Sequence, residues 1–141
     1  MIRFANAGDV FQLTKLAQAY FASGAYWGDT REFSFRAFSN HLKDLINSPV
    51  AKVFVAEKNG TILGGIGVAV LPDVLTGQPV AMKIHWFATG GAGLRLERAA
   101  RKWAKEQGAT AFKMSAMNDN SAKILERLGY SRTEIIYSKA I

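Results

Sequence analysis

The stretch VAMKIHWFATGGAGLRLERAARKWAKEQGATAFKMSA, residues 80–116, decides the fold. Residues 80–88 and 110–116 have the apolar character of strands. Between them, residues 92–107 carry apolar side chains at helical spacing, and Gly108 provides a helix stop. A strand–helix–strand unit of this kind makes its two strands parallel, with a right-handed crossover. The stretch therefore predicts a parallel pair of strands inside the sheet.

Three glycines, Gly90, Gly91 and Gly93, stand where the first of these strands meets the helix. A helix start presents unpaired N–H groups and the positive end of the helix dipole. Glycines remove the Cβ atoms that would keep an anion away, so the backbone could form a phosphate cradle. The structural alternative is a tight turn that needs glycine at left-handed positions. Ligands of α/β sheets bind at this edge, where parallel strands turn into helices.

The rest of the chain predicts one α/β (α+β) domain over residues 1–141, with a mixed, mostly antiparallel sheet. Asn59-Gly60 is a strong hairpin signal between two strands, so the pairs before the parallel unit are antiparallel. The predicted order is β-α-α-β-β-β-α-β-α-β. The remaining predicted strands are 2–5, 52–58, 62–71 and 132–140, and the remaining helices run to about 22, over about 31–47 and from about 118 to 128.

Composition narrows the class of protein. The chain has no cysteine, which excludes disulfides, thiolate zinc sites and cysteine nucleophiles and favours a cytoplasmic location. We find no cluster of metal ligands, no signal-peptide pattern at the start, and no apolar run long enough to cross a bilayer. The net charge of +7 favours an anionic partner such as nucleic acid, an acidic protein surface or a phosphorylated cofactor, or serves solubility alone.

The glycine turn fits neither a Walker P-loop, because Leu94-Arg95 follows Gly93, nor a Rossmann fingerprint, because no glycine lies further into the helix. Together with NDNSAKILERLGY (118–130), it resembles the GNAT superfamily of N-acetyltransferases. Gly91-Ala92-Gly93 takes the place of that family's Gly-x-Gly. Asn118 and Ser121 take the places of its later Asn and Ala, and Gly129-Tyr130 the place of Gly-Phe. The order of elements matches along the whole chain.

The resemblance implies a cofactor, acetyl-CoA or another acyl-CoA, lying where the two parallel strands splay apart. Its pantetheine would pair with the strand backbone and its pyrophosphate would sit on loop amides, with Asn118 and Ser121 nearby. The residues implied are Trp86, Phe87 and Ala88 for the strand, and Gly90, Gly91, Ala92, Gly93, Leu94 and Arg95 for the loop. The sequence departs from the family at Ala88, where an Arg or Gln is usual, and at Leu125, where a tyrosine commonly protonates the CoA thiolate. Tyr130 and Tyr137 are nearby substitutes or structural residues.

Acyl transfer to an amine requires a base. His85, on the strand before the glycines, is the first candidate, and Glu57 is the second; each has a structural alternative as a core residue or a strand end. In this family the loop between the first two helices helps to build the acceptor site. It places Tyr26 and Trp27 there, where they would bind substrate or cap the core.

These observations predict a cytoplasmic N-acetyltransferase that moves an acetyl group from acetyl-CoA to a primary amine of a small molecule or protein. An acceptor amine is the expected partner, and a homodimer stays open. The first alternative is a catalytically degenerate relative, such as a phage-encoded binding or structural protein. A basic nucleic-acid-binding domain is the least favoured, because only charge supports it. The acceptor, the acyl length and the oligomeric state are not determined by the sequence.

Overall fold

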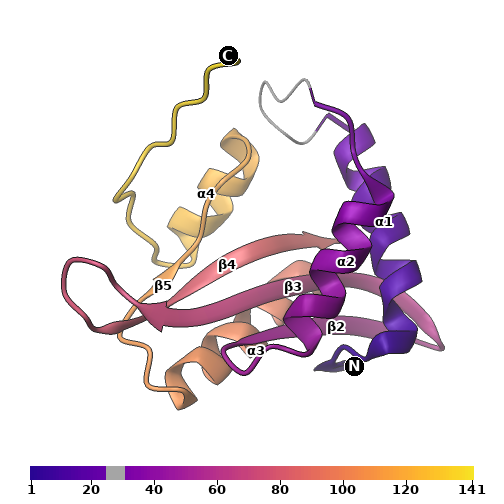
Figure 1. Ribbon diagram of the computed structural model, residues 1–141, viewed down its shortest axis with the longest axis horizontal. Coiled ribbons are helices and arrows are strands. Elements are labelled where there is room, and N and C mark those ends of the chain that lie inside the picture. The colour runs from indigo at the N-terminus through magenta and orange to yellow at the C-terminus, as the bar shows by residue number, and fades with distance from the viewer. Residues whose placement is uncertain (25–30) are drawn as a thin grey trace.

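A five-stranded sheet in the order β1-β2-β3-β4-β5 forms the centre of the computed structural model, which describes residues 1–24 and 31–141 (Figure 1). All neighbouring strands are antiparallel except β4 and β5, which are parallel. The predicted mixed sheet with a parallel strand–helix–strand unit is therefore confirmed. The strands are β1 (Ile2–Phe4), β2 (Ala51–Lys58), β3 (Thr61–Pro72), β4 (Pro79–Ala88) and β5 (Phe112–Lys113).

Helices cover both faces of this sheet (Figure 1). A 3₁₀ turn (Ala7–Asp9) leads into α1 (Val10–Ala22), which packs with α2 (Phe35–Ile46) on one face. The crossover helix α3 (Ala92–Glu106) packs on the other face, and α4 (Asp119–Arg127) follows β5. None of the helices in the described part of the chain is long and apolar enough to cross a bilayer.

Two apolar clusters, one on each face, hold these layers together. Under α3 the cluster includes Ile66, Val68 and Leu96, all fully buried. Under α1 and α2 it includes Leu13 and Leu42, also fully buried. Because side chains of a strand alternate between faces, β2 and β3 contribute residues to both clusters.

Glycines in the middle of β3 let neighbouring elements approach its backbone closely. A Cβ at Gly64 would lie 2.5 Å from the carbonyl oxygen of Phe87, and one at Gly67 would lie 2.5 Å from the ring of His85. A Cβ at Gly65 would lie 2.7 Å from Leu13 of α1. These three glycines therefore make room for side chains and backbone of β4 and α1.

Three element boundaries differ from the sequence prediction. Helix α2 begins at Phe35 rather than near residue 31, because the Ser34 hydroxyl caps it by accepting from the Ala37 N–H at 3.1 Å. Strand β5 keeps two residues of the predicted 110–116. The strand predicted over 132–140 does not form: its backbone joins no ladder, and Ile135, Ile136 and Tyr137 are exposed. An isolated extended segment without a partner edge gains no ladder hydrogen bonds, so β-propensity alone does not make it a strand.

We expect Gly64→Ala to destabilise the protein by about 1–3 kcal/mol, because the added methyl group meets backbone atoms that have little room to move. Chemical denaturation measures the loss. Gly93→Ala is the matched control, since a Cβ there would meet its nearest atom, Trp86 Nε1, at 3.6 Å, an ordinary contact. Equal stabilities of the two variants would contradict the close packing of β3 against β4.

Candidate cofactor and acceptor sites

The strands β4 and β5 part soon after they meet. Their pairing covers only Ala81 with Phe112 and Met82 with Lys113, while β4 continues to Ala88. In the described residues no strand pairs with the edge of β4 that extends from 83 to 88. The two strands therefore form a fork. One arm of the fork is the edge of β4 over residues 83–88, whose backbone N–H and C=O groups on that side pair with no strand of the described residues.

The orientation of the backbone along β4 follows from two contacts with β3. The Thr89 N–H donates to the Leu63 carbonyl at 2.8 Å, and the Phe87 carbonyl oxygen lies against Gly64. Because backbone groups of an antiparallel strand alternate in direction, those of Trp86 and Ala88 point to the open side of the fork. These are the groups that an extended ligand could pair with.

A lysine spans the base of the fork. Lys83 Nζ donates to the carbonyl of Ser115 at 2.7 Å, so it links β4 to the segment after β5 where the ladder has ended. Burial lowers the pKa of Lys83 to about 8. Sequence analysis did not single out Lys83, because its neighbours along the chain do not distinguish it from a solvated lysine.

Helix α3 begins at the open end of the fork, directly after two left-handed glycines. Gly90 and Gly91 have φ of 59° and 76°, and a Cβ on either would meet nothing within 4 Å. Backbone conformation is therefore what requires glycine at these two positions, as the turn alternative predicted. The indole N–H of Trp86 donates to the Gly93 carbonyl at 3.0 Å and fixes the start of α3 against β4.

Most amides of this helix start have no acceptor. The Ala92 N–H donates to the Thr89 carbonyl at 3.2 Å. The N–H groups of Gly91, Gly93 and Leu94 have no acceptor within the described chain, and no side chain caps the helix. They remain available to an anion, together with the helix dipole.

A cleft of ≈ 420 Å³ lies between β4, the start of α3 and α4. Its floor is β4 and the glycine turn, and its far wall is α4. Leu94, Ile124 and Leu128 are large apolar side chains that remain 37–47% exposed here. An apolar cleft that ends at free amides suits a long ligand with an apolar or amide-containing arm and an anionic end. The lining residues are Trp86, Ala88, Gly91, Gly93, Leu94, Ile124, Arg127 and Leu128.

Five residues expected to bind a cofactor thus line one cleft: Trp86, Ala88, Gly91, Gly93 and Leu94. Arg127, on α4, is a cation of the lining that sequence reasoning missed. Its position at the end of α4, two residues before Gly129, could have suggested it only if the placement of α4 beside the fork had been known. The other four residues of the strand and loop, Phe87, Gly90, Ala92 and Arg95, do not line the cleft, and Phe87 and Ala92 are buried in the two apolar clusters.

Asn118 and Ser121 cap the N-terminus of α4. The Ser121 N–H donates to Asn118 Oδ1 at 2.9 Å, and the Asn118 N–H donates to Ser121 Oγ at 3.3 Å, which forms a capping box. They therefore help to fix the helix that carries the cleft wall. Whether they also contact a cofactor stays a prediction.

A buried ionic group holds the end of α4 against α3. Glu97 is 1% exposed, accepts from Tyr130 Oη at 2.7 Å and pairs with Arg101 Nε at 2.8 Å. Burial is the main cause of a raised pKa of the Tyr130 hydroxyl, and the bond to Glu97 adds to it. Tyr130 therefore serves as an anchor, Leu125 is buried, and Tyr137 is exposed in the tail. None of these three residues lines the cleft.

His85 lies on the other face of β4, enclosed by aromatic rings. Its imidazole stacks on Phe87 at 5.5 Å and meets the rings of Phe38 and His41 at 5.4 and 5.7 Å between centroids. Neither ring nitrogen has a hydrogen-bond partner in the described chain. Burial, with smaller contributions from His41 and Lys83, lowers the pKa of His85 to about 3. A general base in acyl transfer must take a proton from the nitrogen of the acceptor amine. An imidazole that resists protonation this strongly is poorly suited to that role.

Glu57 forms an ion pair with Arg3, two strands away from β4 in the sheet. It lies on β2, which β3 separates from β4, and Arg3 Nε donates to its Oε2 at 2.7 Å. The same guanidinium pairs with Asp9 at 2.8 Å, so these contacts tie the N-terminus to the sheet. This geometry favours the structural alternative for Glu57.

The predicted acceptor residues Tyr26 and Trp27 lie outside the described residues. The flanking residues form a second hollow of ≈ 390 Å³ on the α1–α2 face of the sheet. Residues 1–24 and 31–141 contain no group of three or more His, Asp or Glu side chains that could hold a metal ion.

Comparison with family models and with curated proteins finds no match. Solved structures of acetyltransferases, in contrast, match all of this chain. A GNAT family acetyltransferase from Staphylococcus aureus is 18% identical with a TM-score of 0.70, and 98% of it is covered. The ribosomal-protein-alanine N-acetyltransferase of Brucella melitensis is 16% identical, with a TM-score of 0.74 and 99% covered. AAC(6')-Iy, bound to the bisubstrate analogue CoA-S-monomethyl-acetylneamine, is 20% identical, with a TM-score of 0.73 and 98% covered. At these identities the likeness shows the fold, which is that of the GNAT acetyltransferases, as the resemblance implied.

The enclosure of His85 predicts a loss of stability in mild acid. Its folded pKa of about 3 lies below the unfolded value of 6.5, so below pH 6.5 the unfolded chain binds a proton that the folded protein does not. Between pH 7 and pH 5 this group alone should cost about 2 kcal/mol of unfolding free energy. Urea denaturation at the two pH values measures the loss. His85→Gln should show a smaller pH dependence, whereas an unchanged dependence would contradict the enclosed, neutral imidazole.

Proposed function

We propose that the protein is an N-acetyltransferase that uses acetyl-CoA, or another acyl-CoA, to acylate a primary amine. The observation that carries this proposal is the cleft along the open edge of β4, which ends at the unpaired amides of Gly91, Gly93 and Leu94. An acyl-CoA supplies an activated acyl carbonyl in the form of a thioester.

The cleft matches the parts of such a cofactor in order. The outward backbone groups of Trp86 and Ala88 can pair with the amides of the pantetheine arm, because no strand among residues 1–24 and 31–141 pairs with them. Leu94, Ile124 and Leu128 give this arm an apolar wall. The helix-start amides and the Arg127 guanidinium can then hold the diphosphate.

The structural neighbours support the same assignment. AAC(6')-Iy holds an analogue that joins CoA to an acetylated amine, and the Brucella melitensis protein is named for acetylation of an alanine on a ribosomal protein. These are properties of those proteins, and this chain shares their fold.

Leu125 favours one alternative, a GNAT-fold protein that binds acyl-CoA without catalysis. It occupies the place of the family's usual tyrosine, and its side chain is buried. Thiolates are tolerable leaving groups near neutral pH, so the absence of that tyrosine slows the reaction without abolishing it. Release of free thiol with an amine panel separates the two alternatives.

Acetyl-CoA should raise the melting temperature. At 100 times its dissociation constant, a ligand adds about 2.7 kcal/mol to stability. Leu94→Glu places a carboxylate beside the diphosphate and should weaken the binding of acetyl-CoA about 10-fold or more, as measured by calorimetry. Leu94→Gln has the same size without the charge and should retain most of the affinity. Leu94 is 47% exposed, so both variants should fold.

Two results would count against this proposal. Acetyl-CoA and CoA that leave the melting temperature unchanged would remove its basis. Equal affinities of the Glu and Gln variants would place the diphosphate elsewhere, away from the start of α3.

A further inference from the structure

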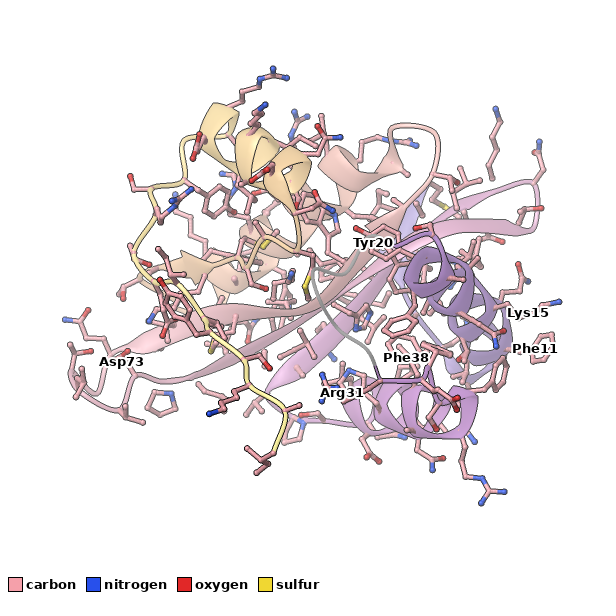
Figure 2. All side chains as sticks on the ribbon, turned by 90° about the horizontal axis from the view of Figure 1, so that it is seen from above. Phe11, Lys15, Tyr20, Arg31, Phe38 and Asp73 are labelled. Atoms are coloured by element: carbon pink, nitrogen blue, oxygen red, sulfur yellow. The ribbon has the colours of Figure 1, made fainter. Side chains whose placement is uncertain are left out.

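The second hollow lies on the α1–α2 face of the sheet, whereas the cofactor cleft is lined by the β4 residues Trp86 and Ala88 and by α3 and α4. Its lining comes from the end of α1, residues 31–34 and the first turns of α2. Phe38 and His41 of this lining contact His85, which faces away from the cleft residues Trp86 and Ala88. The two hollows therefore flank the same strand. Figure 2 shows Phe38 with Arg31 beside it on the α1–α2 side of the sheet. The complete lining is Phe21, Arg31, Glu32, Phe33, Ser34, Ala37, Phe38 and His41.

Aromatic rings form a continuous wall of this hollow. Phe21 and Phe33 lie 5.8 Å apart between ring centroids, and Phe33 and Phe38 lie 5.9 Å apart. Phe38 continues to Phe87 of β4 at 6.1 Å. Such a wall favours a flat apolar group, which can stack against it or meet it edge to face. The volume of ≈ 390 Å³ is near the lower end of the usual range for small-molecule sites, about 300–1,000 Å³.

The charged groups of the lining do not favour a polycation. Among the described lining residues there is one carboxylate, Glu32, and one guanidinium, Arg31, and both residues are exposed. The whole chain carries a net charge of +7. A substrate with several ammonium groups would need more carboxylates than the described lining residues offer, and the net positive charge of the chain would repel it at longer range. A substrate with one amine meets no such obstacle.

His41 is the lining residue that can receive a proton. It is partly exposed, in contrast to His85, which lies enclosed behind it. Two charged or titratable side chains near it are Asp44, one turn further along α2, and His85 of β4. Burial lowers the pKa of His41 and Asp44 acts in the opposite direction, so the imidazole is neutral at neutral pH.

We propose that this hollow is the acceptor site, that it selects a primary monoamine carried on an aromatic or similarly flat apolar body, and that His41 accepts the proton. This rests on the proposed acetyl transfer. The neutral amine nitrogen attacks the thioester carbonyl carbon, a C–N bond forms and the C–S bond breaks. CoA leaves as the thiolate, and the proton lost by the amine nitrogen goes to the His41 imidazole.

The substrate class is tested with three amines, namely phenethylamine, spermidine and the aminoglycoside kanamycin. Free thiol release gives kcat and KM, and calorimetry in the presence of CoA gives binding without turnover. We expect kcat/KM for phenethylamine to exceed that for the two polycations at least 10-fold, and phenethylamine to bind the CoA complex. Phe33→Leu should raise KM for phenethylamine with little change in kcat, because it removes a ring from the wall.

A designed change of specificity gives a sharper test. Ala37→Glu adds a carboxylate to the lining at an exposed position in the first turn of α2, where an acid is compatible with the helix dipole. It should raise kcat/KM for spermidine relative to phenethylamine about 10-fold, whereas the matched control Ala37→Gln should not. Unchanged selectivity in Ala37→Glu would place the acceptor outside this hollow.

The role of His41 is tested by His41→Gln, with acetyl-CoA affinity as the control. We expect kcat to fall 10-fold or more and the acidic limb of the kcat/KM profile to be lost, with cofactor and phenethylamine binding retained. An unchanged profile would show that His41 does not take the proton.

The outcomes separate this inference from the function on which it rests. If acetyl-CoA binds and only the polycations are acetylated, or if no aromatic amine binds or reacts, the substrate class is wrong while the cofactor site stands. If neither acetyl-CoA nor CoA binds, the proposed function itself fails.

Discussion

The early separation of β4 from β5 is the constraint on which the rest of this structure depends. Two residue pairs join the strands, and six further residues of β4 run on without a neighbour on that side. Unpaired backbone groups normally cost free energy when they are buried, so such an edge must meet solvent or a ligand. The fork therefore leaves main-chain groups of β4 open along one side of the cleft, and side chains of α3 and α4 form its other walls.

Three sets of side-chain contacts fix the elements around the fork. The indole of Trp86 fixes the start of α3 to β4, and Lys83 links the base of the fork to Ser115. Glu97 of α3 accepts a hydrogen bond from Tyr130 and forms an ion pair with Arg101. The bond to Tyr130, which follows α4 in the chain, keeps α4 beside α3. A carboxylate this buried would be costly alone, and a charge-assisted pair of partners makes its burial tolerable. The cleft wall thus depends on a polar contact whose residues do not themselves line the cleft.

The two faces of β4 have different chemistry because its side chains alternate. Trp86 and Ala88 face the cleft, where apolar side chains remain exposed. His85 and Phe87 face a layer of aromatic rings from α1 and α2. Gly67 of β3 leaves space for the His85 ring within this layer. The strand β4 therefore lies between the cleft proposed for the acyl donor and the hollow proposed for the acceptor.

The sequence by itself determined the order of elements as far as α4, the parallel unit and the position of the glycine turn. These follow from local rules: the periodicity of residues 92–107, the hairpin signal at Asn59-Gly60 and the left-handed preference of Gly90 and Gly91. Only the tertiary structure decided which side chains meet. It enclosed His85 and engaged Glu57, brought Arg127 to the cleft and left residues 132–140 without a partner strand. The burial of a side chain, its ion pairs and the pairing of strands depend on contacts between segments that are distant in the sequence. The periodic pattern of one segment does not predict those contacts.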